Sequence, residues 1–123
     1  MAYNEKLAAR TREIISLSHS NIEEKKMFGG LCFMVNDKMC VGVKEHRMMF
    51  RIDPAIHDQV LEKQGCHPMI MKGKELKGYV FVNTDVLSRK KDLEYWVSLA
   101  LDYNKMAPAP KKKNPKKKTA KPG

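Results

Sequence analysis

The sequence predicts an α+β domain with two layers, in which helices cover one face of an antiparallel sheet. Three observations support this fold class. Residues 31–52 contain short apolar runs separated by turn residues. Apolar residues recur at helical spacing in the first 18 residues and again after residue 88. Asp53-Pro54 is a typical helix start between two groups of strands. The expected order is α-β(3)-α-β(2)-α.

The first helix is predicted to begin at Asn4, whose side chain can cap exposed backbone N–H groups. Residues 18–21, Ser-His-Ser-Asn, are typical of an exit loop. Residues 25–28 then form a candidate short edge strand, which Gly29-Gly30 ends. The predicted apolar stripe of this helix consists of Leu7, Thr11, Ile14, Ile15 and Leu17 or Ser18.

The centre of the chain predicts an antiparallel meander of three strands. Two apolar runs, residues 31–35 and 38–44, flank a short Asn-Asp turn and therefore predict a hairpin. A third strand follows over residues 48–52. Its side chains alternate, so Met48, Phe50 and Ile52 are expected on one face and Met49 and Arg51 on the other.

After Asp53-Pro54, a short helix with Ile56, Val60 and Leu61 on its buried side is expected to stop at Gly65. Two further strands are predicted over residues 69–71 and 79–82, with turns at residues 72–74 and 77–78. The last helix is expected to begin near Thr84-Asp85 or Ser88 and to end before Pro108 and Pro110. Its predicted stripe consists of Leu93, Trp96, Val97, Ala100, Leu101 and Asn104.

The charge divides the chain into a body, residues 1–107, and a lysine-rich tail, residues 108–123. The chain has 24 Lys and Arg residues against 14 Asp and Glu residues, a net charge of +10. Seven of the lysines and none of the acids lie in the tail, so the body carries only about +3. The tail lysines, candidates for non-specific nucleic-acid contact, are Lys111, Lys112, Lys113, Lys116, Lys117, Lys118 and Lys121.

Composition argues against several other classes of protein. No apolar run approaches the ~18 residues of a membrane span, so no membrane partner is expected. The first residues do not resemble a secretory signal, which favours the cytoplasm. The three cysteines form no CxxC pair, and Cys32 and Cys40 are expected to be small apolar residues in strands. We therefore expect no disulfide framework, no metal site and no cofactor.

Catalytic residues are not predicted either. The four histidines, His19, His46, His57 and His67, are scattered, and their spacing builds no nucleophile–base arrangement. The segment Met27-Phe28-Gly29-Gly30 could direct backbone N–H groups at an anion, but it does not open a helix. We interpret Met27, Phe28, Gly29 and Gly30 mainly as a tight turn or bulge where strands meet.

Other features leave a binding surface open. Cations at strand ends and turns fit either a solvated surface or an anionic partner. Tyr79 and Phe81 alternate on a strand as base-stacking aromatics do, although core packing is favoured. Among the nine methionines, Met48-Met49, Met69 and Met71 could form an adaptable partner surface, although most methionines are assigned to the core. The cations are Lys44, Arg47, Arg51, Lys72, Lys74, Lys77 and, at the start of the last helix, Arg89-Lys90-Lys91.

Several separated segments resemble the N-terminal domain of the TfoX/Sxy family. The first is residues 26–35, Lys-Met-Phe-Gly-Gly-Leu-Cys-Phe-Met-Val. The resemblance spans roughly residues 3–106 and continues through residues 38–43, 51–54, 65–69, 77–82 and 93–97. It implies an α-β(3)-α-β(2)-α domain over residues 1–107. It also implies a role like that of bacterial competence regulators, which act as coactivators with the cAMP receptor protein. The named members carry a second, C-terminal domain.

These observations favour a non-enzymatic regulatory or interaction domain. Its body would contact a protein partner such as a transcription factor, and its tail would contact nucleic acid without sequence preference. Two alternatives stay open. One is a pure protein-interaction module whose tail only aids solubility. The other is an enzyme with an unrecognised site. No pattern in the sequence predicts an oligomeric state.

Overall fold

The computed structural model describes residues 3–27 and 29–107 of the 123-residue chain. In the described part, the sheet and the helices are the following elements, in chain order: α1 (Glu5–Ser16), β1 (Ile22–Met27), β2 (Gly30–Val35), β3 (Lys38–Val43), β4 (Arg47–Arg51), α2 (His57–Val60), β5 (Cys66–Met71), β6 (Lys74–Asn83) and α3 (Lys90–Asn104). Short 3-10 turns, Pro54–Ile56 and Thr84–Leu87, precede α2 and α3.

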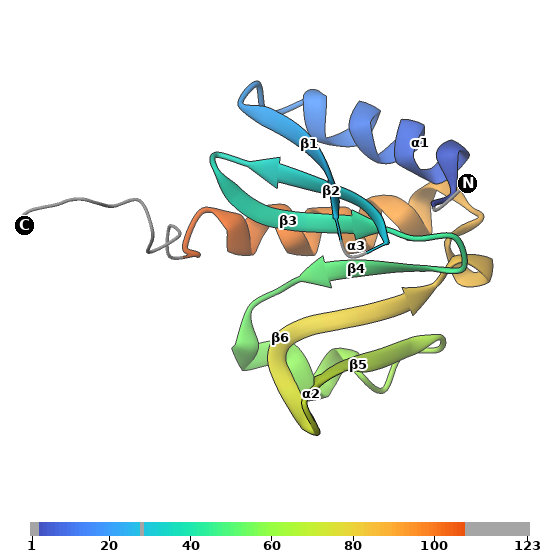
Figure 1. Ribbon diagram of the computed structural model, residues 1–123, viewed down its shortest axis with the longest axis vertical. Coiled ribbons are helices and arrows are strands. Elements are labelled where there is room, and N and C mark those ends of the chain that lie inside the picture. Colours follow the sequence, from blue (N-terminus) through green and yellow to red (C-terminus); the bar gives the residue numbers. More distant parts are fainter. Residues whose placement is uncertain (1–2, 28, 108–123) are drawn as a thin grey trace, which may run out of the picture.

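The strands form one six-stranded sheet in the order β1-β2-β3-β4-β6-β5, with every neighbouring pair antiparallel. The helices lie behind this sheet, which faces the viewer in Figure 1. The predicted α+β fold is confirmed. Four strands precede α2 instead of three, because the candidate edge strand is a full strand that begins at Ile22.

The predicted start of α1 and the predicted turn between β2 and β3 have the expected local chemistry. The Leu7 backbone N–H donates to Asn4 Oδ1 over 3.1 Å, so Asn4 caps α1 as expected. Asn36 and Asp37 both have positive φ, 53° and 66°, which gives the β2–β3 hairpin the twist that a two-residue turn requires. Gly65 has a positive φ of 77°, but α2 already ends at Val60, so Gly65 lies directly before β5 and is not the helix stop that was predicted.

One hydrophobic core lies between the sheet and the helices. Every residue of the predicted α3 stripe is buried, and Trp96 stacks on Phe50 of β4 with 5.7 Å between ring centroids. The C-terminal end of α3 is fixed to the β2–β3 hairpin by polar contacts. Asn104 Nδ2 donates to the Val35 carbonyl over 3.1 Å, and Lys38 Nζ donates to the Asn104 carbonyl over 2.9 Å.

The ends of two helices differ from the prediction. Leu17 follows the last turn of α1 and is 84% exposed, so it is not part of the buried stripe. The helix after Asp53-Pro54 is a 3-10 turn followed by a single α-helical turn, and Ile56 and Leu61 are only half-buried. Pro54 does stand at the first helical position, and Asp53 accepts from the Ala55 N–H over 2.9 Å.

The segment Lys77-Gly78 was expected to be a turn, and this prediction is wrong. Both residues lie inside β6, where Gly78 has a φ of 88° and bends the strand. A Cβ at Gly78 would lie 3.0 Å from the Ile52 carbonyl oxygen, so the backbones approach there too closely for a side chain. The bend lets β6 pair with β4 over residues 79–83 and with β5 along its length (Figure 1).

Among residues 3–27 and 29–107, no helix is long and apolar enough to cross a membrane.

Candidate functional site

The register of the sheet determines which side chains point away from the helices. Directly paired residues of antiparallel strands share a face. Cys32 pairs with Gly42, Gly42 with Met49, and Met49 with Phe81, so these four residues form one row across β2, β3, β4 and β6. The residues on either side of this row, including Phe50 and Val80, point into the core. The open face of the sheet thus carries a continuous apolar row.

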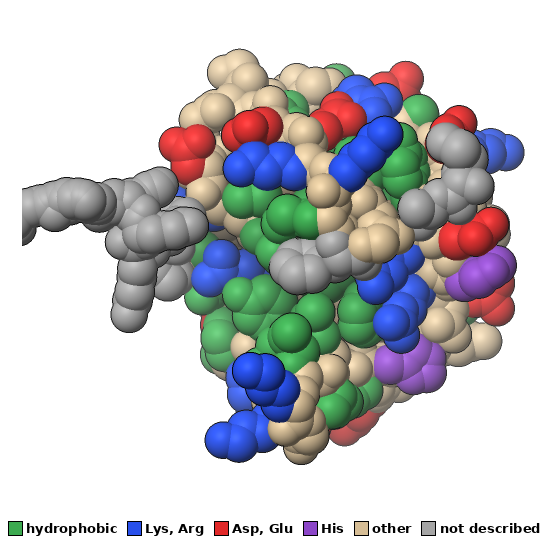
Figure 2. All heavy atoms as spheres, in the orientation of Figure 1, with side chains coloured by type: hydrophobic (Ala, Val, Ile, Leu, Met, Phe, Trp, Pro, Cys, Tyr) green, Lys and Arg blue, Asp and Glu red, His purple; other side chains and the backbone are tan. Residues whose placement is uncertain are grey.

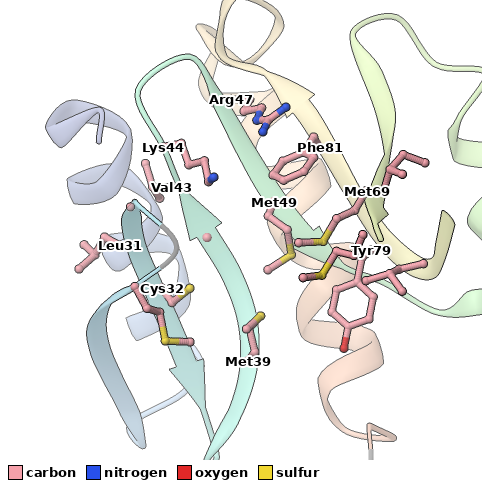
Figure 3. Close-up of a pocket in the computed structure, with 16 residues that line it drawn as sticks. Leu31, Cys32, Met39, Val43, Lys44, Arg47, Met49, Met69, Tyr79 and Phe81 are labelled. Carbon is pink, nitrogen blue, oxygen red and sulfur yellow. The ribbon is translucent and has the colours of Figure 1, made fainter. Parts of the chain in front are cut away.

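This row is the floor of a groove with a volume of about 490 Å³. Gly42 leaves bare backbone in the floor, and a Cβ there would be in ordinary van der Waals contact with Met49 and Cys32 at 3.5–3.7 Å. Figure 3 shows Met39, Met49 and Met69 with their sulfur-bearing ends in the groove. Five methionines from the four strands β1, β3, β4 and β5 line it: Met27, Met39, Met49, Met69 and Met71. Methionine side chains are flexible and polarizable, so such a surface can adapt to a ligand.

The wall of the groove on the β5 side is exposed. Ile70 and Met71 are 55% and 46% exposed, although they are large hydrophobic residues. Both line the groove. Figure 2 shows this face of the molecule, where hydrophobic side chains gather over the middle of the sheet with Lys and Arg side chains around them. A contiguous apolar surface of this kind is typical of an interaction site.

Two cations lie at one end of the groove and share one aromatic ring. The Arg47 guanidinium lies 3.9 Å from the centroid of the Phe81 ring, and Lys44 Nζ lies 5.8 Å from it. Figure 3 shows both side chains beside Phe81. The described lining residues include no carboxylate. Among the described residues, no ion pair neutralises either cation. This end of the groove is therefore electropositive.

Tyr79 and Phe81 were expected to pack in the core, and the structure instead places both on the open face. Each faces a cation, because Arg51 lies 5.5 Å from the Tyr79 ring centroid while Arg47 covers Phe81. Arg51 is also 5.7 Å from the ring of Tyr103. The reason is the register: Tyr79 pairs with Arg51 and Phe81 with Met49, the two β4 residues predicted to face away from the core. Phe81 is 7% exposed, buried by its groove neighbours.

The segment Met27-Phe28-Gly29-Gly30 joins β1 to β2 at the edge of the groove. Met27 ends β1 and lines the groove, and Phe28 lies outside the described residues. Gly29 has a φ of 72° in the connecting turn. A Cβ at Gly30 would lie 2.4 Å from the Val43 carbonyl oxygen, closer than real contacts allow. Gly30 thus lets β2 approach β3 where the two strands meet the groove.

The cysteines are free, buried and poorly suited to nucleophilic chemistry. Burial raises the pKa of Cys40 to about 12 and that of Cys66 to about 11. Burial also raises the pKa of Cys32, at the floor of the groove. A thiolate is the reactive form of cysteine, so these thiols are largely unreactive near neutral pH.

A polar cluster that the sequence did not predict lies outside the groove, at the bend of β6. His57 is fully buried, although the sequence suggested only a helical histidine. The Gly78 N–H donates to His57 Nδ1 over 3.0 Å, and His57 Nε2 lies 2.7 Å from Glu75 Oε2. Because Nδ1 accepts, the proton is on Nε2, which donates to the Glu75 carboxylate.

This hydrogen bonding does not suit a metal ion. The ligand atoms of His57, Asp58 and Glu75 lie within 4.8 Å of one another, a spacing that could hold a cation. Nδ1 is occupied by the Gly78 N–H, and Nε2 carries the proton that Glu75 accepts. Asp58 pairs with Lys77 over 2.9 Å. We therefore interpret the cluster as the polar support of the β6 bend.

The other cations that the sequence singled out are not gathered into one site. Lys77 pairs with Asp58, while Arg89 and Lys90 pair with Asp92 and Glu94 over 3.2 and 4.0 Å. Asp92 and Glu94 therefore offset part of the positive charge at the start of α3. The seven tail lysines lie outside the described residues.

Sequence reasoning found parts of the groove without assembling them. It marked Met48-Met49, Met69 and Met71 as candidates for a partner surface, and it separated Met49 and Arg51 from the core face. Of these methionines, Met48 is fully buried in the core instead. The roles of Gly42 and Cys32 had no local signal, because each depends on which residue of the next strand lies opposite. The register between strands that are distant in sequence supplies that information.

Comparison with known proteins identifies one family. The family model described as the TfoX N-terminal domain matches residues 15–103, which include only the last two residues of α1, the whole sheet and almost all of α3. Searches of the curated proteins and of the solved structures find no match.

Proposed function

Because the chain belongs to the TfoX N-terminal domain family, we propose that it is a non-enzymatic regulatory domain whose body binds a protein partner, such as a transcription factor, through the groove. The observation that carries this proposal is the apolar, methionine-lined groove on the open face. An antiparallel sheet that helices cover on only one face usually carries polar residues on its other face. Here the second face keeps large apolar side chains in contact with water, which favours a covering partner.

The chemistry of the described titratable groups supports binding over catalysis. The three thiols are buried and have raised pKa values, so they are weak nucleophiles. Both ring nitrogens of the buried His57 are engaged in hydrogen bonds, so the ring has no free nitrogen to act as a general base.

Affinity capture with groove variants tests this function. Full-length tagged chain, a Gly42→Leu variant that adds a large side chain to the groove floor, and a Ser98→Leu control would be used on extracts of the source cells. Ser98 is exposed on α3, so the control adds the same side chain on the helical face. We expect one protein to be recovered by the wild-type chain and by Ser98→Leu and lost with Gly42→Leu. Equal recovery by all three forms would exclude the groove as the binding surface.

We further propose that the lysine-rich tail contacts nucleic acid without sequence preference. The segregation of charge supports this, because seven lysines and no acids lie in residues 108–123. Lysine neutralises phosphate without reading bases. A gel mobility-shift assay would compare the full chain with a chain whose seven tail lysines are glutamines. We expect a log-log salt slope of about −6 for the wild-type chain if every lysine engages duplex DNA. Equal binding by both chains would contradict this role, and no binding at physiological salt would leave the tail a solubility element.

A further inference from the structure

We infer that the segment captured by the groove is an acidic, amphipathic stretch of protein. In this inference, its large apolar side chains pack on the methionines and a carboxylate at its edge meets Lys44 and Arg47. The inference rests on the proposed function and goes beyond it by specifying the chemistry of the partner. Three features of the groove support it: its adaptable apolar floor, its uncompensated positive end and its open shape.

The floor and the β5 wall favour apolar anchors. The row Cys32, Gly42, Met49 and Phe81 offers no hydrogen-bonding side chain other than a buried thiol with a raised pKa. Gly42 leaves bare backbone between the flexible Met49 side chain and Cys32, where an apolar side chain can pack once Met49 repacks. Flexible methionine surfaces bind the apolar faces of varied helical or extended segments by repacking. A partner with two or more large apolar side chains on one side fits this floor.

The positive end specifies the charge of the partner. Arg47 and Lys44 lie over Phe81 within 3.9 and 5.8 Å of its centroid, which holds both cations at the edge of the apolar floor. The described lining includes no carboxylate that would compensate them. A carboxylate beside an apolar anchor would complete this end, whereas a cationic segment would be repelled.

Three other occupants fit less well. The tail of the same chain is basic, so the same two cations would repel it. Nucleic-acid bases need an exposed aromatic face, but Phe81 is 7% exposed and the Arg47 guanidinium already covers its ring. Small ligands are usually enclosed and oriented by several polar groups, whereas this groove is open along the sheet and mostly apolar.

Three synthetic 16-residue peptides would test the inference. All share one apolar face of Leu and Phe, and their polar faces carry glutamate, glutamine or lysine. The protein would be the full chain with its seven tail lysines replaced by glutamine, so that the tail cannot attract the acidic peptide. Binding would be followed by methyl NMR of labelled methionines. Met49 and Met69 report on the groove, Met48 on the core face, and the exposed Met106 on the region after α3.

We expect the acidic peptide to shift Met49 and Met69 while Met48 and Met106 change little. It should bind about 10-fold more tightly than the lysine peptide, and a Lys44→Glu/Arg47→Glu variant should reverse this preference. Equal groove binding by acidic and basic peptides would overturn the inferred partner chemistry and leave the proposed function intact. Groove shifts with a dT15 oligonucleotide that exceed those with the peptides would overturn it in favour of nucleic acid. If no probe shifts the groove methionines and the Gly42→Leu variant still captures its partner, both the inferred partner chemistry and the proposed function would be overturned.

Discussion

Single residues decide how closely the strands approach beside the groove. Gly30 has no space for a side chain, because a Cβ would lie 2.4 Å from the Val43 carbonyl oxygen. Its neighbour Gly29 has open space around it and a φ of 72°. The two glycines therefore serve different purposes: one permits a close backbone approach, and the other permits a left-handed turn.

The Gly30→Ala substitution should lower the free energy of unfolding by about 1–3 kcal/mol, because the Val43 carbonyl is backbone and cannot move aside easily. The Gly29→Asn control should change it by less than about 1 kcal/mol, because asparagine tolerates positive φ and nothing lies near its Cβ. Urea unfolding of both variants would measure the difference. Equal stability of Gly30→Ala and wild-type protein would show that β2 and β3 do not approach so closely.

The three thiols should resist modification in the folded protein. Burial raises the pKa of Cys40 to about 12 and of Cys66 to about 11, and it also raises the pKa of Cys32. At pH 8 we expect a disulfide reagent to label fewer than one thiol per chain in minutes, and three thiols after denaturation in urea. Rapid labelling of one native cysteine would contradict the burial of these thiols.

At the scale of the elements, an ion pair between Arg12 and Glu24 links helix α1 to the edge strand β1. Arg12 donates to Glu24 through Nη2 over 2.7 Å, and this hydrogen bond lowers the pKa of Glu24 below its ordinary value of 4.5. A carboxyl whose pKa is lower in the folded state contributes stability above its unfolded pKa. That contribution is lost as the pH falls through the folded pKa.

We therefore expect Glu24→Gln to be less stable than wild-type protein at pH 7, with the difference shrinking as the pH falls below 4.5. The difference at pH 7 should be small, because both side chains are partly exposed. Urea midpoints at pH 7 and pH 3 would measure it. A stability difference that grows toward pH 3 would mean that the Arg12–Glu24 ion pair does not stabilise the contact between α1 and β1.

The elements themselves were largely predictable from the sequence. The α3 stripe has strict helical spacing, and Asn36-Asp37 and Asp53-Pro54 have unambiguous local chemistry. Lys77-Gly78 misled the prediction, because a glycine that bends a strand and a glycine in a turn look alike locally. The bend at Gly78 depends on Ile52 and on the buried His57, which are distant in sequence. Likewise, the site needs the pairing of Gly42 with Met49 and of Met49 with Phe81.

At the scale of the whole molecule, two surfaces of different chemistry belong to different parts of the chain. Most of the net charge of +10 lies in the tail, whereas the body presents an apolar groove with two cations at its end. The proposed contacts follow this division: nucleic acid through the tail and an acidic, apolar protein segment through the groove. The helical face opposite the groove is expected to serve stability.

Site-specific photo-crosslinking in the source cells tests the central claim, that the open sheet face contacts the partner. A benzophenone amino acid would replace Ile70, which is 55% exposed on the groove wall, or Ser98, which is exposed on α3. The account predicts one discrete crosslinked protein from position 70, absent when Gly42→Leu fills the groove, and no such product from position 98. The same product from position 98, or its persistence in the groove-filled variant, would contradict it.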